Sequence, residues 1–444
     1  MSTAEHVERL PAARTDVPPR VAATAQRVAG LGALTGLVAA GFLLAAGATG
    51  QRLFFFIPSS SGGFPGWLRG PLSAVGLSLT PPQAARLLVV MGICYLVVLA
   101  CARVLPARVA VGAVVALHVV FLLAPPLFSA DVFGYIDYAR LGVLHGLNPY
   151  THGAAAAPHD AVTPFVRWHD IASPYGPLFT TLGYPLAHVS VPLALWIYKA
   201  IAALAGLACT GLTWVAARQA GREPLPATLF VGLNPLLLAY AVGGAHNDLL
   251  LTAVVLGAVT LAGAGHERLA GAQLALAAGL KASAGLVLPF LLLGARRRVS
   301  VLSGVLAGAV LVAIPAVTLF GGHALGFVTQ LNGQQGLVAR GSVPSQISGL
   351  FGYPDLAPGV RLCATVFAAT SVLWLLWRTY RGMNWVAAAG WATLAVLVGT
   401  AWLTPWYVVW ALPLAAASGD RRLRNATLAF CAFIVTTRVQ HYIP

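Results

Sequence analysis

Long apolar runs separated by short polar connections follow one another along nearly the whole chain. The runs that are long enough, or nearly long enough, to cross a bilayer are 28–50, 85–102, 109–127, 193–217, 226–242, 249–264, 299–320, 360–377, 384–402, 404–418 and 425–441. A helix needs about 20 apolar residues to span the hydrocarbon core. The pattern therefore predicts an all-α protein built around a bundle of membrane-spanning helices.

One apolar stretch, 269–295, has an arginine at each end, Arg268 and Arg296. Arginine is enriched in cytoplasmic loops, so both ends are expected on the cytoplasmic side. The stretch should therefore form a hairpin of two short helices with Lys281 at its outer tip. The two helices are expected at 269–280 and 283–295.

The same reasoning on sidedness predicts a polytopic protein with about 13 crossings. Residues 1–27 should form a cytoplasmic tail, and 28–444 a single membrane domain. Residues 177–190 are apolar, yet the alternation of sides leaves no room for a span, so we expect a re-entrant or interfacial helix. The large outer loops are expected at 51–84, 128–176 and 321–359.

The second outer loop contains a polar island, residues 129–178, that differs from the rest of the chain. It holds four of the 12 acidic residues and four of the 11 histidines. They are Asp131, Asp137, Asp160, Asp170, His145, His152, His159 and His169. A segment this polar cannot lie in hydrocarbon. We interpret the island as the lid and catalytic edge of an active site.

Composition supports the membrane interpretation. Hydrophobic residues make up 58% of the chain and charged residues 9%, and the mean hydropathy is +0.80. This excludes an ordinary soluble protein. The net charge of +15 is explained by orientation and by anionic lipid rather than by nucleic acid. The five cysteines are scattered in apolar runs and predict neither disulfides nor a metal site.

Asp131 is the leading candidate for a catalytic residue. If 131–144 is helical, Asp131, Tyr135 and Tyr138 share one face of the helix. A carboxylate at a membrane boundary, partly desolvated, is suited to act as a general base. The alternative is that Asp131 caps the start of this helix.

Two turn-forming motifs of the island, Asn148-Pro149-Tyr150 and Ser173-Pro174-Tyr175, should stiffen the lid. Their tyrosines are suited to stack on a sugar ring or to pack within the loop. Asp137 and Arg140 are spaced for a local ion pair, which is the interpretation we favour. The four histidines lack the spacing of metal ligands.

A second polar cluster, Gly243 to Asp248, forms a short turn between two apolar runs. Its glycines allow close approach of the backbone to a ligand. His246, Asn247 and Asp248 at a membrane edge are costly without partners. We favour a binding role over the alternative, in which Asp248 only caps the following helix.

The chain has two lysines, Lys199 and Lys281. Lys281 lies within the apolar hairpin, where an ammonium group is expensive unless it meets an anion. We expect it to bind a phosphate rather than to snorkel to the surface. For Lys199, about two turns into its helix, snorkelling is favoured over a second phosphate contact.

Further candidates lie toward the C-terminus. Arg340 is followed by the hydroxyl-bearing sequence Ser342-Val343-Pro344-Ser345-Gln346 on the third outer loop. Trp406 and Tyr407 follow Trp402 in a turn, as an interfacial aromatic belt or as a platform for sugar stacking. The side chains predicted to contact substrate are Tyr135, Tyr138, Asn148, Tyr150, Tyr175, His246, Asn247, Asp248, Ser345, Gln346, Trp406 and Tyr407.

Six segments follow one another in order over about three quarters of the chain. They are SADVFGYIDYARLGVLHGLNPY at 129–150, SPYGPL at 173–178, NPLLLAYAVGGAHND at 234–248, GLKAS at 279–283, SVPSQ at 342–346 and TPWYVVWALPL at 404–414. Together they resemble the actinobacterial GT-C glycosyltransferases that use polyprenyl-phosphate sugars, in particular the α-1,6-mannopyranosyltransferase A/B family. The N-terminal region and the 51–84 loop match nothing recognisable.

The resemblance implies a GT-C-like, multi-pass plasma-membrane enzyme with an extracytoplasmic active site. It implies transfer of mannose, with inversion, from a polyprenyl-phosphate donor to a glycan or glycolipid acceptor. Asp131 stands where the family has its presumed base, and Lys281, helped by Arg340, would hold the donor phosphate. No cofactor or metal is predicted, although His246 and Asp248 are of a type that can ligate one.

Three alternatives remain open from the residues. The same mechanism would serve another polyprenyl-phosphate sugar, such as arabinose or glucose. A transporter or flippase of lipid-linked sugars would have polar residues spread through the bundle and repeated halves, whereas here they gather on one side. A scaffold subunit would tolerate changes at Asp131 and Lys281.

Overall fold

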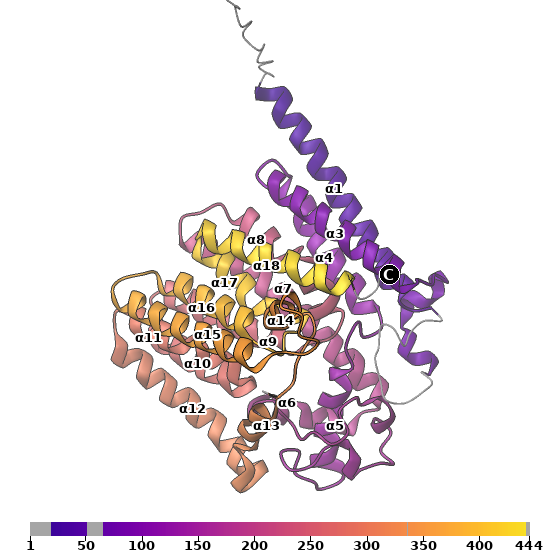
Figure 1. Cartoon of the computed structure of the whole chain (residues 1–444), viewed down its shortest axis with the longest axis vertical. Coiled ribbons are helices and arrows are strands. Elements are labelled where there is room, and N and C mark those ends of the chain that lie inside the picture. The colour runs from indigo at the N-terminus through magenta and orange to yellow at the C-terminus, as the bar shows by residue number, and fades with distance from the viewer. Residues whose placement is uncertain (1–18, 51–64, 335, 441–444) are drawn as a thin grey trace, which may run out of the picture.

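The computed structural model describes residues 19–50, 65–334 and 336–440, and all regular elements in these ranges are helical (Figure 1). The predicted cytoplasmic tail up to residue 18 lies outside the described residues. So do residues 51–64 of the first predicted outer loop.

Five of the described helices are long and apolar enough to cross a membrane. They are α1 (Pro19–Gly47), α3 (Pro81–Cys101), α7 (Val191–Gln219), α12 (Arg298–Phe320) and α15 (Pro358–Tyr380). Shorter apolar helices include α4 (Ala107–Leu123), α9 (Asp248–Gly263) and α16 (Trp385–Gly399). The described residues therefore form an all-helical membrane protein, while the figure of about 13 crossings stays a prediction.

Two predicted spans are not single α-helices. The run 226–242 consists of α8 (Pro224–Gly232) and the π-helical turn η6 (Leu237–Val242), with a break at Asn234. Pro235 follows the break and has no N–H to donate. The Oδ1 atom of Asn234 instead accepts hydrogen bonds from the backbone of the next turn, at 3.0 and 3.2 Å. The run 404–418 likewise consists of η9 (Pro405–Tyr407) and α17 (Val408–Ser418).

The predicted hairpin is broken at Lys281, as expected. Helix α10 (Glu267–Leu280) ends there, Lys281 is extended, and η7 (Ala282–Leu286) and α11 (Leu288–Gly294) follow. The segment 177–190 forms the short helices α6 (Pro177–Gly183) and η5 (Tyr184–His188), while its re-entrant or interfacial position stays a prediction.

A backbone hydrogen bond joins the start of α6 to the bend at Lys281. The Gly176 N–H donates to the Leu280 carbonyl at 3.0 Å. A Cβ atom at Gly176 would lie 2.2 Å from the Gly279 carbonyl oxygen, so a side chain would force the segments apart. The polar island and the Lys281 bend are thereby held together.

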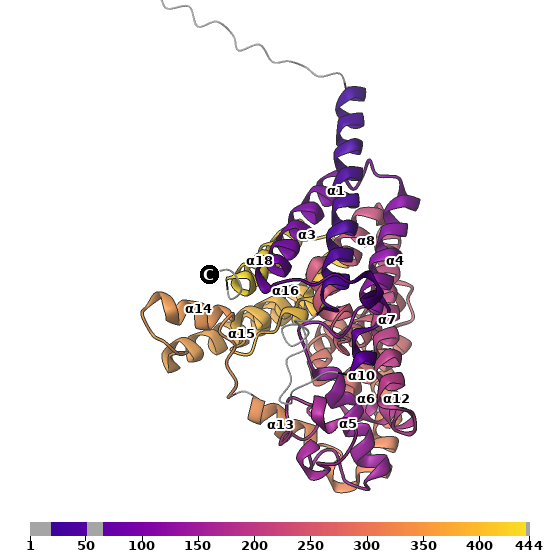
Figure 2. The same cartoon turned by 90° about the vertical axis from the view of Figure 1, so that its right-hand side faces the viewer.

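The remaining described elements surround this region. Helix α1 extends from one end of the molecule, and α5 (Asp131–Leu144) with its following loop lies at the opposite end (Figures 1 and 2). Helix α7 packs against α4, α8, α9 and α17. The others are η1 (Gly66–Arg69), η2 (Pro71–Val75), η3 (Ala154–Ala156), η4 (Thr163–Phe165), η8 (Gly321–His323), α13 (Gly326–Gln334), α14 (Val343–Leu350) and α18 (Arg421–Val439).

Helices α12 and α15 carry wide apolar faces that no other described element covers. Leu306, Leu311 and Val317 are exposed on α12, as are Leu362 and Leu373 on α15. Apolar faces of this extent mark contact with lipid or with another apolar partner.

Candidate active site

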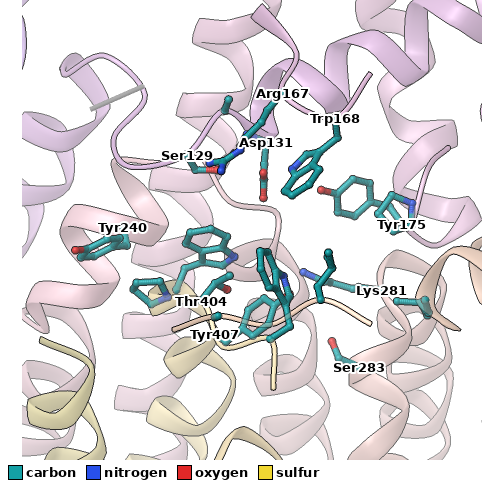
Figure 3. Close-up of a pocket in the computed structure, with 18 of the residues that line it drawn as sticks. Ser129, Asp131, Arg167, Trp168, Tyr175, Tyr240, Lys281, Ser283, Thr404 and Tyr407 are labelled. Carbon is teal, nitrogen blue, oxygen red and sulfur yellow. Dashed lines mark hydrogen bonds between the residues drawn. The ribbon is translucent and has the colours of Figure 1, made fainter. Parts of the chain in front are cut away.

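A cavity of about 720 Å³ lies where the polar island, the Lys281 bend and the turn 402–407 meet (Figure 3). Its charged lining residues, among those described, are one carboxylate and three cations: Asp131, Arg167, Lys281 and Arg438. Aromatic rings make up much of the remaining wall. A cavity of this size and character is suited to an anionic ligand that also carries a ring.

Asp131 is the first residue of α5, whose predicted range of 131–144 is confirmed. Ala130, not Asp131, occupies the capping position. The Asp131 side chain points into the cavity (Figure 3) and is 24% exposed. Burial raises its pKa to about 6, against the lowering effects of Lys281 and Ser129. A carboxylate with such a pKa can accept a proton near neutral pH.

His246 lies directly behind Asp131. Its Nδ1 atom is 3.7 Å from Asp131 Oδ2, and its ring stacks on Trp406 with 3.7 Å between centroids. Burial and the charge of Lys281 lower the pKa of His246 well below its usual range. The imidazole is therefore neutral, and its contact with Asp131 is not an ion pair.

Lys281 faces Asp131 across the cavity and is paired with Asp248. Its Nζ atom donates to Asp248 Oδ1 at 2.7 Å, and Trp410 Nε1 donates to the same oxygen at 2.7 Å. The lysine does not snorkel outward, because its ammonium lies 5.2 Å from the Tyr407 ring centroid and 5.4 Å from that of Trp410. Asp248, the first residue of α9, serves this network rather than a helix cap.

Five of the predicted aromatic residues lie in or directly behind the cavity wall around Asp131 and Lys281. Tyr138 and Tyr175 line the cavity, and the Tyr138 hydroxyl donates to the Ile171 carbonyl at 2.9 Å. Tyr135 is buried behind them. Its hydroxyl lies 3.5 Å from Asn247 Oδ1 and 3.4 Å from the Asn247 N–H, which links α5 to the 243–248 turn. Trp406 and Tyr407 also line the cavity.

Asn148 and Tyr150 lie outside the lining and join the polar island to neighbouring segments. Asn148 Nδ2 donates to the Phe320 carbonyl at 3.1 Å. The Tyr150 hydroxyl donates to the Tyr175 carbonyl at 3.0 Å and lies 3.1 Å from Thr180 Oγ1. Their polar groups are used within the protein.

The predicted residues of the third outer loop also lie outside the lining. Arg340 is exposed, and its carbonyl accepts a bond from Gln346 Nε2 at 2.8 Å. Ser345 Oγ accepts from Ser342 Oγ at 2.9 Å within the first turn of α14. From this loop Leu331, Leu337 and Ala339, the neighbour of Arg340, line the cavity.

Two predicted interactions are wrong. Arg140 does not pair with Asp137; its Nε donates to Asp160 Oδ1 at 2.7 Å, and His145 Nε2 lies 2.7 Å from Asp160 Oδ2. Although burial raises the pKa of Asp160, these bonds hold it below its usual value. Burial and the nearby Asp160 raise the pKa of Asp137 to about 7. Arg140 thus pairs with Asp160 from the loop instead of with Asp137, its neighbour on the same helix.

The other wrong interaction concerns Lys199, which does not snorkel. Its side chain is fully buried. Its Nζ atom donates to the Gly243 carbonyl at 2.9 Å.

Several lining residues were not among the predicted site residues, and they include Arg167, Trp168 and Arg438. The Arg167 guanidinium lies 5.3 Å from the Trp168 ring centroid, and Arg438 Nη2 donates to the Leu403 carbonyl at 2.9 Å. Arg167 and Trp168 belong to the polar island, and the unusual composition of the island is the sequence feature that could have indicated them. Arg438 lies in an apolar run near the C-terminus and gave no such signal.

A second, apolar pocket of about 330 Å³ adjoins the cavity. The two share Ala282, Ser283, Val396 and Trp410 as lining residues. The further walls of the apolar pocket are mainly aliphatic, from α9 and the η7–α11 segment. In the described part of the chain, no group of three or more His, Cys, Asp or Glu side chains is arranged to hold a metal ion.

The fold and the cavity define a helical membrane protein whose pocket joins a carboxylate, several cations and aromatic rings. The family described as alpha-(1->6)-mannopyranosyltransferase, N-terminal domain, matches residues 33–297. The MptB C-terminal domain matches residues 341–439. The chain belongs to this family of alpha-(1->6)-mannopyranosyltransferases, which confirms the resemblance seen in the sequence.

Individual relatives agree with this placement. Alpha-(1->6)-mannopyranosyltransferase A of Mycobacterium tuberculosis is 29% identical over 69% of this chain and 65% of its own length. The A protein of Corynebacterium glutamicum is 34% identical over 39% of this chain and 36% of its own length. The B protein of that organism is 26% identical over 66% and 56%. The chain thus spans less than two thirds of the length of these relatives. No solved structure matches it significantly.

Proposed function

We propose that this protein transfers mannose from a polyprenyl-phosphate donor to a glycan or glycolipid acceptor and forms an α-1,6 bond. The observation that carries the proposal is the cavity, in which Asp131 faces Lys281 next to an apolar pocket. The names of its relatives support the sugar and the linkage. Because the chain spans only part of their length, the whole activity is part of this proposal.

The donor phosphate would lie at the Lys281 side of the cavity. Lys281 and Ser283 line the polar cavity, and Ser283 also borders the aliphatic walls of the second pocket. An anionic head joined to a long hydrocarbon chain needs this change from polar to apolar walls. Arg167 and Arg438 would add positive charge, the helping role that the sequence had suggested for the exposed Arg340.

Asp131 would act as the general base. As the acceptor hydroxyl oxygen attacks the anomeric carbon, its proton passes to the Asp131 carboxylate. The bond between the anomeric carbon and the phosphate oxygen breaks, and polyprenyl phosphate leaves with the electron pair. A β-linked donor therefore gives an α-linked product. The cations stabilise the negative charge that develops on the leaving phosphate.

The reaction would take place at the extracytoplasmic face of the plasma membrane. Three arginine clusters lie in connections between apolar runs that are separate from the polar island. They are Arg218–Arg222, Arg296–Arg298 and Arg421–Arg424. A surplus of arginine favours the cytoplasmic side. The island and its cavity would then lie outside, where polymeric acceptors of the envelope are reached.

A transfer assay with purified protein in detergent tests this function. The donors offered are polyprenyl-phospho-mannose, polyprenyl-phospho-arabinose and a nucleotide-linked mannose, each radiolabelled, with short α-1,6-linked mannosides as acceptor. We expect label from the first donor alone, in a product cleaved by an α-1,6-specific mannosidase. Transfer from polyprenyl-phospho-arabinose instead would keep the reaction type and change the proposed donor sugar to arabinose. No transfer from any lipid-linked donor would refute the proposal.

A further inference from the structure

Lys199 is a fully buried lysine inside the apolar helix α7. Its ammonium donates to the Gly243 carbonyl at 2.9 Å and to the Pro125 carbonyl at 3.4 Å. A buried ammonium is expensive, and apolar residues would fill the same space at lower cost. The two bonds therefore have to serve something other than packing.

The two carbonyls belong to the two segments that carry the site. Pro125 begins the stretch that leads to Asp131, and Gly243 begins the turn that leads to Asp248. The segments also bond directly, because the Leu127 N–H donates to the Gly243 carbonyl at 3.0 Å. Lys199 thus lies at a point where both segments meet α7.

The backbone of both segments is strained. Among the described residues other than glycine, two have positive φ: Phe128 at 61° and Ala245 at 57°. Each lies in one of the two segments. Such conformations cost about 1–3 kcal/mol and persist only where the surroundings enforce them. Lys199 bonds the chain at Pro125, three residues before Phe128, and at Gly243, two residues before Ala245. Both bonds are therefore close enough to restrain the strained residues.

We propose that Lys199 is a positioning residue, which clamps 125–131 to 243–248 so that Asp131 faces the Lys281–Asp248 pair at the correct separation. The proposal rests on the proposed transfer reaction. It assigns Lys199 no contact with substrate, because its ammonium is enclosed by backbone carbonyls and is absent from the cavity lining.

The test replaces Lys199 by methionine, which has a similar length and needs no partner. We expect kcat to fall by about 10- to 100-fold, since a displacement of about 1 Å costs this much. The KM for the donor should stay within about threefold, because the Lys281–Asp248 pair is retained. Lys199→Gln, a neutral donor, should recover part of the loss. Thr213→Val is the matched control, since it removes a buried hydroxyl further along α7.

Hydrogen exchange of the purified variants, read by mass spectrometry, tests the clamp without any transfer. Lys199→Met should speed exchange in peptides covering 125–131 and 243–248, and Thr213→Val should not. Normal exchange there, or a normal kcat, would overturn the proposal. The proposal would also be overturned if Lys199→Met lowered kcat, donor affinity and thermal stability together, because that result indicates a general folding role. If the wild type transferred no sugar, the proposed function would fail, while the exchange result would still decide on the clamp.

Discussion

At Asp131, burial and neighbouring charge act in opposite directions. Burial favours the protonated form, while Lys281 and the Ser129 hydroxyl favour the carboxylate. Burial prevails, and the pKa is raised to about 6. The group is then ionised at neutral pH yet basic enough to take a proton from an attacking hydroxyl.

This pKa predicts the pH dependence of transfer. The carboxylate form is required, so activity is full above about pH 7 and falls as pH drops through 6. Well below pH 6 the rate should decrease roughly tenfold per pH unit. The measurement is kcat between pH 4.5 and 8, with donor binding followed over the same range. A rate that is constant down to pH 4.5 would remove Asp131 from the role of base.

Lys281 should govern the affinity for the lipid phosphate. Lys281→Met is expected to weaken binding of polyprenyl phosphate by at least about tenfold, as for loss of a charge-assisted hydrogen bond. Titration with polyprenyl phosphate in detergent measures this. The double variant Lys281→Met/Asp248→Asn is the control, because it avoids leaving the Asp248 carboxylate buried and unpaired. Unchanged affinity in both variants would exclude the phosphate role.

Residue types and spacing predicted part of this site. Polar residues that interrupt apolar runs predicted that Asp131 begins a helix and that Lys281 lies at a bend. Arg438 could not be found in this way, because its contact with the cavity depends on how α18 packs. Lys199 was misjudged because sequence shows depth along a helix but not which face is enclosed.

At the scale of elements, the loop 145–176, the part of the island that the sequence suggested as a lid, is joined to α5 by an ion-pair cluster. Asp160 accepts bonds from Arg140 and His145, and its side chain is 3% exposed. Tyr138, on the same helix, bonds the Ile171 carbonyl at the far end of the lid. These contacts join the loop 145–176 to α5, which begins at Asp131.

Asp160→Asn should therefore loosen the lid. Breaking a buried ion pair costs about 3 kcal/mol or more, and the cost should be local, because the pair joins one loop to one helix. We expect faster hydrogen exchange in 145–176 and easier proteolysis there. Asp170→Asn, an exposed position on the same loop, is the control. Equal protection in the two variants would show that the cluster does not hold the lid.

The elements most readily predicted from sequence are those fixed by local pattern. The helix 131–144 and the break at Lys281 were both predicted, because polar residues mark their ends. The break at Asn234 was not, since the apolar run continues through it. The side chain of Asn234 replaces the missing backbone partners, an arrangement that hydropathy does not show.

At the scale of the whole molecule, hydropathy predicted an all-helical membrane protein, which is what the described residues form. It could not place the helices relative to one another, because contacts between segments such as 125–131 and 243–248 join distant parts of the chain. The single-domain organisation and the number of crossings stay predictions.

The proposed orientation is testable by labelling. In a cysteine-free background, Ala161→Cys in the lid should react with a membrane-impermeant maleimide added to whole cells. Arg297→Cys should react only after the cells are opened. Both positions are exposed, so a difference reports the side of the membrane. Labelling of Arg297→Cys alone in whole cells would invert the topology and place the cavity in the cytoplasm.

The central claim is that Asp131 is the base of a sugar transfer from a lipid phosphate. The most direct measurement compares wild type with Asp131→Asn for transfer from polyprenyl-phospho-mannose and for binding of that donor. Asp137→Asn, on the same helix but outside the lining, is the control. The account predicts at least about a hundredfold loss of transfer in Asp131→Asn, with donor binding kept and the control near wild type. Transfer at the wild-type rate by Asp131→Asn would contradict it.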